Sequence, residues 1–444
     1  MNKEFHKKQN FFSFSDIDSE RKDRIMKFTS TEATPAPHVP PGVLRLTGAA
    51  KEDIPMYRIQ TMNKISPVGL NRFPSELYEV GDAVQDPQGI LVRSAKLLDL
   101  EFNPSLLAIA RAGVGVNNIP LDRCAAAGIP VFSTPGANAN AVKELVICAM
   151  LMGSRDIPGA IRWVREQAAS GVDVSTVVEK GKSAFIGPEL YKKTLGIIGL
   201  GAIGSIVANT AISLGMDVYG YDPFLSVDTA LRLDRHVHVV KDINDLYKRS
   251  DYITMHIHYT EKTAYMIDAS AIAAMKRGVR VINLARGEIV DDEAMLTALD
   301  TGMVAAYITD FPNNRLLTAP HVIAMPHLGA STPESEQNCA AMAVDTLRDY
   351  LESGNIRSSV NLPEMTMDRS GVQRLCVLHK NVPGMLANIT SLFGRDGVNV
   401  ENLSNKSRGD YAYTMVDLGS KVGDNVIEDV RRTANVIRVR SLEW

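Results

Sequence analysis

A glycine-rich turn constrains the fold of this chain more than any other feature of its sequence. The apolar segment Leu195–Ile198 leads directly into Gly199-Leu200-Gly201-Ala202-Ile203-Gly204, which fits the pattern GxGxxG and opens a helical segment. The next apolar segment ends at Asp222, 23 residues after Gly199. In such a βαβ unit the first glycine permits a tight turn, the second lets the backbone approach a pyrophosphate, and the third lets helix and strand pack closely. The pattern predicts a Rossmann dinucleotide-binding domain.

The same unit predicts which dinucleotide binds. A helix that begins at the glycine turn offers unpaired N–H groups and a positive dipole to a diphosphate. A carboxylate at Asp222 accepts hydrogen bonds from the ribose hydroxyls and repels a 2′-phosphate, so we expect NAD rather than NADP. The residues expected to hold it are Gly199, Gly201, Ala202, Ile203, Gly204 and Asp222. The alternative, a glycine turn used only for packing, is disfavoured by the complete βαβ context.

The rest of the chain shows three kinds of pattern. Residues 1–55 are rich in Lys, Ser, Thr and Pro, and we expect this extension to be disordered. From about Tyr57, short apolar strands alternate with helical stretches, as in α/β folds with parallel sheets. After about Asn361 the order of expected elements is βαββαβ, with the second and third strands at Val398–Leu403 and Tyr411–Leu418, which predicts a separate ferredoxin-like domain. We expect the linker around Pro363 to make few contacts.

Composition excludes several classes of protein. No apolar run reaches the roughly 18 residues of a membrane-spanning helix. The formal net charge of −3 gives no sign of nucleic-acid or membrane binding. The four cysteines are too scattered for a zinc site or a disulfide framework, and no metal is expected. We expect a cytoplasmic protein.

Four further motifs surround the glycine turn in sequence order. They are Arg111-Ala112-Gly113-Val114-Gly115-Val116-Asn117-Asn118, Thr134-Pro135-Gly136-Ala137-Asn138, Asn283-Leu284-Ala285-Arg286-Gly287 and Pro326-His327-Leu328-Gly329-Ala330-Ser331-Thr332. With the turn, they resemble the D-2-hydroxyacid dehydrogenase family over about residues 57–350. The C-terminal run Leu378-His379-Lys380-Asn381-Val382-Pro383-Gly384-Met385-Leu386 resembles the start of an ACT domain. This pairing is typical of the phosphoglycerate dehydrogenases in that family.

The resemblance implies a domain plan and an activity. A flavodoxin-like substrate-binding domain would comprise residues 56–138 and 328–360, a Rossmann NAD-binding domain residues 139–327, and an ACT regulatory domain residues 370–444. The implied reaction is NAD-dependent oxidation of 3-phospho-D-glycerate to 3-phosphohydroxypyruvate, the first step of L-serine biosynthesis. Homodimers or homotetramers are implied as well, because the family dimerises through the dinucleotide-binding domain and ACT domains pair edge to edge.

The chemistry assigns roles to two residues of these motifs. Oxidation of a 2-hydroxy acid needs a base that takes the hydroxyl proton, and a histidine titrates near neutrality. His327 matches the family's base. The substrate's carboxylate and developing carbonyl need a planar, permanently charged donor, and Arg286 matches the family's arginine. The resemblance also adds Ala285, Arg286, His327 and Gly329 to the cofactor-binding set.

Substrate binding is assigned to a second group of residues. Arg93-Ser94 matches the loop that holds substrate in phosphoglycerate dehydrogenases. Val114, Gly115 and Asn138 are expected near the carboxylate and the nicotinamide. The phosphate needs cations, for which Arg93 is the first candidate and Lys96 and Lys64 are weaker ones.

One segment departs from the family pattern. The family places a glutamate in D-V-F-x-x-E-P, and this carboxylate pairs with the catalytic histidine. Here the segment is Thr309-Asp310-Phe311-Pro312-Asn313-Asn314-Arg315. Alignment of the phenylalanine puts Asn314 at the glutamate's place, and an amide cannot offset the charge of an imidazolium. Either Asp310 takes over, or the histidine works without this partner.

The ACT resemblance implies an effector site. In this family's ACT domains a histidine and asparagines bind L-serine at a domain–domain interface, and the matching residues here are His379, Asn381 and Asn399. The alternative is an ACT domain that only assembles the oligomer. Two further alternatives concern the whole protein: a dehydrogenase for another 2-hydroxy acid, or a non-catalytic NAD(H) and amino-acid sensor on the same fold.

Overall fold

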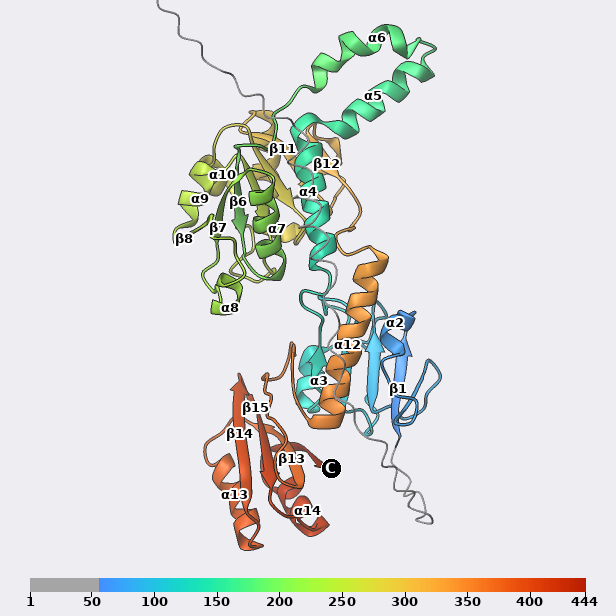
Figure 1. Cartoon of the computed structure of the whole chain (residues 1–444), viewed down its shortest axis with the longest axis vertical. Coiled ribbons are helices and arrows are strands. Elements are labelled where there is room, and N and C mark those ends of the chain that lie inside the picture. The colour runs from blue at the N-terminus through green and yellow to red at the C-terminus, as the bar shows by residue number, and fades with distance from the viewer. Residues whose placement is uncertain (1–55) are drawn as a thin grey trace, which may run out of the picture. The chain divides into compact units, whose positions relative to one another are not determined.

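The computed structural model describes residues 56–444, so the disorder expected for residues 1–55 lies outside the described residues. The described part contains three sheets (Figure 1). Two are parallel and one is antiparallel. The predicted α/β class with a C-terminal ferredoxin-like domain is therefore confirmed.

The first sheet has the strand order β2-β1-β3-β4-β5, with every pairing parallel. This is the flavodoxin-like order predicted for the substrate-binding domain. Its elements are β1 (Tyr57–Met62), α2 (Pro67–Leu70), β2 (Tyr78–Gly81), β3 (Gly89–Val92), β4 (Ala108–Arg111), α3 (Leu121–Ala126) and β5 (Val131–Phe132). The strands β3 and β4 are almost completely buried, which explains their unbroken apolar sequence.

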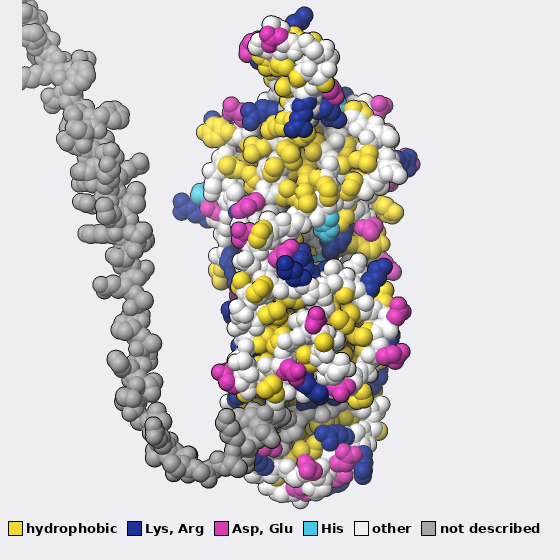
Figure 2. Space-filling view, turned by 90° about the vertical axis from the view of Figure 1, so that its right-hand side faces the viewer, with side chains coloured by type: hydrophobic (Ala, Val, Ile, Leu, Met, Phe, Trp, Pro, Cys, Tyr) yellow, Lys and Arg dark blue, Asp and Glu magenta, His cyan; other side chains and the backbone are white. Residues whose placement is uncertain are grey.

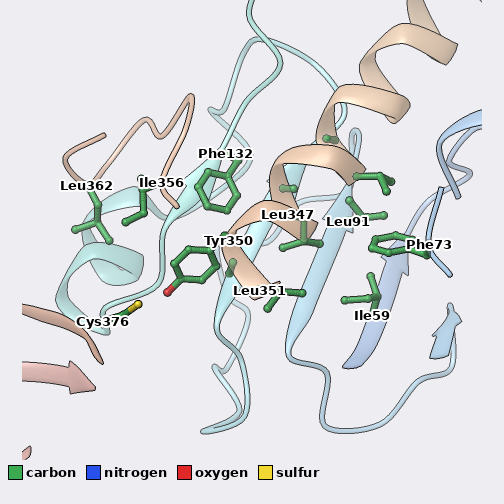
Figure 3. Packing of buried hydrophobic residues seen from close by; sticks show 14 of the residues in the cluster. Ile59, Phe73, Leu91, Phe132, Leu347, Tyr350, Leu351, Ile356, Leu362 and Cys376 are labelled. Carbon is green, nitrogen blue, oxygen red and sulfur yellow. The ribbon is translucent and has the colours of Figure 1, made fainter. Parts of the chain in front are cut away.

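A long helix from later in the chain completes this domain. Helix α12 (Pro333–Ser353) begins with Thr332, whose hydroxyl accepts a hydrogen bond from the Ser335 amide. It ends at Gly354, which adopts the left-handed conformation with φ 75°. Between these ends, Leu347 and Leu351 pack against Ile59 and Leu91 of the sheet (Figure 3).

The second sheet has the strand order β12-β11-β10-β9-β6-β7-β8, again with parallel pairings. Its elements are β6 (Thr194–Ile198), α7 (Ala202–Ser213), β7 (Asp217–Tyr221), α8 (Val227–Ala230), β8 (Val237–Val240), α9 (Ile243–Arg249), β9 (Tyr252–Met255), α10 (Ala269–Ala273), β10 (Val279–Asn283), η2 (Gly287–Ile289), α11 (Asp292–Asp300), β11 (Val304–Thr309), η3 (Leu316–Thr318) and β12 (Val322–Ala324). The order β8-β7-β6-β9-β10-β11 is the Rossmann order 3-2-1-4-5-6.

Three helical segments precede this sheet in the chain. Helix α4 (Ala139–Arg155) shares an apolar core with α7, on the opposite side of the sheet from the core formed with α9, α10 and α11. Helix α5 (Ile157–Ala169) and helix α6 (Val174–Gly181), followed by η1 (Lys182–Phe185), form a hairpin that buries almost none of its side chains (Figure 1).

The third sheet is antiparallel, with the order β14-β15-β13-β16. Its elements are β13 (Gln373–Lys380), α13 (Met385–Arg395), β14 (Val400–Arg408), β15 (Tyr411–Leu418), α14 (Asp424–Arg432) and β16 (Val436–Glu443). Leu375 and Val377 of β13 share a core with α13 and α14. The alternate residues Cys376 and Leu378 belong to the core that contains α12. Both faces of this sheet are therefore packed.

The linker to the third sheet makes many contacts, so the expectation of few contacts around Pro363 is wrong. Leu362 and Met365 are buried, and Ile356 pairs with Met365 as an isolated bridge. Ile356 and Leu362 lie in one cluster with Phe132, Tyr350 and Cys376 (Figure 3). The apolar residues near Pro363 therefore belong to the protein core.

Two arginines of the third sheet bind the end of α12. Arg374 donates to Ser353 O at 2.8 Å, and Arg440 donates to Tyr350 O at 3.1 Å and Leu351 O at 2.9 Å. The last carbonyls of a helix lack partners within it, and the negative end of the helix dipole attracts cations. The C-terminal domain thus caps the longest helix of the first domain.

Candidate active site

The predicted catalytic residues follow three neighbouring parallel strands. Arg286 lies just after β10, Asp310 directly follows β11, and His327 lies just after β12. The glycine turn follows β6, and Arg93 follows β3 of the other parallel sheet. In open α/β sheets, ligands bind outside the carboxyl ends of the strands. The topology therefore places these residues at ligand-binding edges.

The glycine turn has the geometry that a dinucleotide requires. Gly199 adopts φ 91°, which favours glycine, and a Cβ on Gly204 would lie 1.9 Å from Gly199 O. A Cβ on Gly201, by contrast, meets no atom within 4 Å, so the space beside this backbone is open. Gly199 and Gly204 thus serve the turn and its packing, and Gly201 leaves room for a pyrophosphate.

Asp222 lies against this turn. Its Oδ2 accepts from the Leu200 amide at 2.9 Å, and its Oδ1 accepts from the Phe224 amide at 2.9 Å. Each carboxylate oxygen can accept a further hydrogen bond. The carboxylate is therefore fixed in position and can still accept hydrogen bonds from ribose hydroxyls. These residues fit the adenosine half of NAD.

A buried asparagine that the sequence did not single out holds the Arg286 turn. Asn283 donates to Arg286 O at 2.9 Å and accepts from the Ala285 amide at 3.2 Å. The Arg286 guanidinium donates to Ala285 O at 2.6 Å and lies over the Phe311 ring, 5.9 Å from its centroid. Arg286 is half-buried, so part of its guanidinium remains available to a ligand.

His327 is exposed, and its ring lies against Phe311 with the centroids 4.7 Å apart. Asp310 lies beneath the loop that follows His327. Asp310 is 1% exposed, its Oδ2 accepts from the Gly329 amide at 3.2 Å, and its Oδ1 is buried without a protein donor. Burial raises the pKa of Asp310 above the usual aspartate value, whereas the nearby His327 acts in the opposite direction.

Asn314 lies elsewhere. Its side chain is exposed, in the short segment between β11 and η3. The neighbouring Asn313 donates to Asp292 at 2.6 Å and caps η3. The geometry therefore favours Asp310 over Asn314 as the group that interacts with His327.

A second histidine near the glycine turn does not titrate at working pH. His256 follows β9, and its Nε2 lies 3.2 Å from Thr254 Oγ1. Burial lowers the pKa of His256 to about 3. It stays neutral, so of these two histidines only the exposed His327 suits acid–base catalysis.

The guanidinium groups of Arg111 and Arg286 meet at the loop that follows β4, and Arg93 lies beside Arg111. Cβ atoms placed on Gly113 and Gly115 would lie 2.5 Å from Arg111 Nη1 and 3.3 Å from Arg286 Nη2, respectively. Arg111 Nε donates to Arg93 O at 3.0 Å. Burial lowers the pKa of Arg111, and the charges of Arg286 and Arg93 lower it further. Arg111 is a site residue that was not expected from the sequence, although it stands first in the motif that contains Val114 and Gly115.

The other residues predicted to bind substrate differ in exposure and in their distance along the chain from the arginine cluster formed by Arg93, Arg111 and Arg286. The loop of Lys64 reaches it through Asn63, whose Oδ1 accepts from the Ser94 amide at 3.1 Å. Lys64, Ser94 and Lys96 are all exposed, and Val114 is half-buried. Asn138 precedes α4, and its Oδ1 is buried without a donor. The unpartnered oxygens of Asn138 and Asp310 are acceptors that a bound carboxamide or hydroxyl can use.

The predicted effector residues do not meet within one chain. His379 is buried, with Nδ1 2.8 Å from Lys380 O and Nε2 2.8 Å from Thr414 Oγ1. Asn381 donates to Gly409 O at 3.1 Å, just beyond the end of β14, whereas Asn399 directly precedes its start. A nine-residue strand spans about 30 Å. Asn381 and Asn399 can share a site only if the C-terminal domain of a second chain contributes one of them.

Comparison with known proteins identifies the class and then the family. Residues 147–329 match the family model of the D-isomer specific 2-hydroxyacid dehydrogenase, NAD binding domain. The fold, the glycine turn and this match define an NAD-binding dehydrogenase. The chain is 31% identical to D-3-phosphoglycerate dehydrogenases of Haemophilus influenzae and Escherichia coli, over 82% of this chain and 88% and 89% of theirs. The chain belongs to the D-isomer-specific 2-hydroxyacid dehydrogenase family.

Other relatives are longer. A D-3-phosphoglycerate dehydrogenase of Synechocystis is 36% identical over 71% of this chain, but the match covers 56% of that protein. Among solved structures, the NAD+-bound 3-phosphoglycerate dehydrogenase of Entamoeba histolytica aligns with a TM-score of 0.54 and 26% identity, over 69% of this chain and 99% of that one. An NADPH-dependent glyoxylate/hydroxypyruvate reductase of Sinorhizobium meliloti aligns with a TM-score of 0.57 and 26% identity, over 68% of this chain and 97% of that one.

Among residues 56–444, no helix is long and apolar enough to cross a membrane. The same part of the chain contains no group of three or more His, Cys, Asp or Glu side chains that could hold a metal ion.

Proposed function

We propose that this chain is a cytoplasmic enzyme that oxidises 3-phospho-D-glycerate to 3-phosphohydroxypyruvate with NAD, the first step of L-serine biosynthesis. The observation that carries the proposal is that the Arg111 and Arg286 guanidiniums meet at Gly113 and Gly115, with Arg93 beside Arg111. A 2-hydroxy acid with a terminal phosphate carries a carboxylate and a dianion, and three guanidiniums match this charge.

Each residue then has one chemical task. His327 takes the proton of the substrate's 2-hydroxyl group as general base. Arg286 binds the carboxylate and the oxygen that becomes the carbonyl, and Arg93 and Arg111 bind the phosphate. The glycine turn and Asp222 would hold NAD, which would supply the acceptor for the hydride that leaves C2. Asp310 stabilises His327 once the imidazole is protonated, because its carboxyl lies beneath the same loop.

We also propose that the protein is a homo-oligomer. The α5–α6–η1 hairpin exposes Ile161, Val164, Val178 and Ile186, which is 81% exposed. Figure 2 shows hydrophobic side chains over the surface below this hairpin. A second copy of the chain would bury both surfaces. Ile161→Lys combined with Ile186→Lys should then shift the mass measured by light scattering toward the monomer.

L-Serine is proposed as the effector of the ACT domain. Because Asn381 and Asn399 lie at opposite ends of β14, the site would form between ACT domains of two chains. Asn381→Ala should raise the serine concentration needed for inhibition. The proposal fails if the intact protein shows neither serine binding by calorimetry nor serine inhibition.

One experiment tests the reaction and its rivals together. NADH absorbance is followed with 3-phospho-D-glycerate, D-glycerate, D-lactate and 4-phospho-D-erythronate, each with and without serine. We expect the highest kcat/KM with 3-phospho-D-glycerate. Preference for an unphosphorylated acid would identify a different dehydrogenase, and NADH binding without turnover of any acid would favour the non-catalytic sensor.

A further inference from the structure

Helix α12 brings one acidic side chain to the arginine cluster. Glu336, in the first turns of the helix, accepts from Arg93 Nη2 at 2.5 Å. Cys339, three residues further along, lies close enough to Arg111 to influence its pKa. One face of this helix therefore borders the proposed phosphate site, and the side chain nearest to Arg93 carries a negative charge.

This charge opposes the binding of anions at the site. Within residues 56–444, Glu336 is the only acidic side chain that forms an ion pair with Arg93, Arg111 or Arg286. Arg93 and Glu336 are each 43% exposed, so the pair can open when a ligand arrives. An anionic substrate that uses Arg93 must share the guanidinium with Glu336 or displace it.

We propose that Glu336 makes the site select a terminal phosphate over a terminal carboxylate. A substrate carboxylate is the same kind of group as the Glu336 carboxylate that already binds Arg93. Glu336 competes with it at an advantage, because Glu336 is held near Arg93 by the chain itself. A phosphate dianion brings a second charge and three acceptor oxygens, so it can engage Arg93 and Arg111 together. Glu336 weakens the binding of both anions to Arg93, but only the phosphate dianion can displace Glu336 from the guanidinium. The site therefore selects the phosphate. This inference rests on the proposed function, since it assigns the phosphate to Arg93.

The test compares two 2-hydroxy acids that differ at the far end. We would measure kcat/KM for 3-phospho-D-glycerate and D-malate with wild type, Glu336→Gln and Glu334→Gln. Glu334 is a matched control, because it is exposed in the same turn and forms no ion pair within the described residues. Exposed pairs contribute about 0.2–1 kcal/mol, so Glu336→Gln should raise kcat/KM for D-malate about 1.4- to 5-fold. The rise for 3-phospho-D-glycerate should be smaller, and Glu334→Gln should change neither value.

A binding measurement separates this inference from the proposed reaction. Thermal shifts with NADH and either inorganic phosphate or succinate give the relative affinity of the site for the two anions. Glu336→Gln should improve succinate binding more than phosphate binding. If wild type does not oxidise 3-phospho-D-glycerate, the proposed function fails, while these shifts still test Glu336. If Glu336→Gln weakens the phosphate ligands and leaves D-malate and succinate unchanged, Glu336 only orients Arg93 and the inference is overturned.

Discussion

Asp310 is held in a position where its negative charge is unfavourable. The carboxyl is buried, one oxygen accepts a single amide hydrogen bond, and the other has no donor. Burial raises the pKa of Asp310, and only the nearby His327 and backbone amides oppose this shift. A buried charge that costs stability at a ligand-binding edge is typical of a functional carboxyl.

This cost predicts how stability depends on pH. Because the pKa of Asp310 is higher in the folded state, its contribution to stability is present below the ordinary aspartate pKa and is lost as pH rises through the folded-state pKa. Asp310→Asn, which cannot ionise, should therefore raise the Tm at pH 7.5. The gain should shrink toward pH 4. Differential scanning fluorimetry across this range measures it, with the exposed Asp82→Asn as control. An unchanged or lower Tm at pH 7.5 would show that His327 fully compensates the buried charge.

Replacement of the proposed base should separate catalysis from binding. His327→Ala should lower kcat by roughly 10²–10⁴-fold, the usual contribution of a positioned acid–base group. NADH affinity, measured by fluorescence titration, should change little, because the glycine turn and Asp222 remain. His236→Ala is the control, since His236 is an exposed histidine paired with Asp234. Turnover near the wild-type rate would remove His327 from the mechanism.

Some site residues could be predicted from the sequence and others could not. The types and order of His327, Arg286 and Asp222 could be read from motifs, because each chemical task requires a particular side chain. The competition between Asp310 and Asn314 could not be resolved, because the sequence does not show which of the two side chains is buried beneath the loop after His327. Arg111 was missed because its guanidinium folds back beneath Gly113, and only the structure shows that it meets Arg286.

At the scale of elements, the strand bounds predicted from the sequence match the structure where most residues of the strand are buried. β15 was predicted at its observed bounds, Tyr411–Leu418, because seven of its eight residues are buried. β14 was expected over Val398–Leu403 but spans Val400–Arg408. Its second half, Ser404–Arg408, is polar because this edge strand is largely exposed, so apolar patterning could not mark its end.

The glycine turn gives a prediction at this scale. Gly204→Ala should destabilise the fold by about 1–3 kcal/mol, since its methyl group would collide with Gly199 O. Gly201→Ala should leave the Tm nearly unchanged, since its methyl group meets no protein atom. It should nevertheless weaken NADH binding about tenfold or more, because the methyl group fills the space expected for the pyrophosphate. Full NADH affinity in Gly201→Ala would mean that the dinucleotide does not approach this backbone.

At the scale of the whole molecule, the C-terminal domain is joined to the domain of the first sheet by a shared core and by arginines. Sequence patterning predicted the ferredoxin-like fold of this domain, because the residues of its own core alternate regularly along β13 and β15. Sequence patterning could not predict that this domain packs against α12. The second face of β13 and β15 is buried against α12, and that helix ends 20 residues before β13 begins.

The strongest test of this arrangement is the ion pair between Arg374 and Asp417. Both side chains are 0% exposed, and Arg374 also donates to the carbonyls of Ser353, Met367 and Asp368. Removing one partner of a buried pair leaves an uncompensated charge, so Asp417→Asn should lower the free energy of unfolding by roughly 3–5 kcal/mol. Urea denaturation measures this loss, and proteolysis should then cleave within residues 354–372.

Glu443→Gln is the matched control in the same domain. Its pair with Lys421 is exposed, and its loss should cost no more than about 1 kcal/mol. If both variants unfold at the wild-type urea concentration, the buried pair does not stabilise the junction. If Asp417→Asn is destabilised and still resists cleavage in the linker, the shared apolar core alone holds the C-terminal domain against α12.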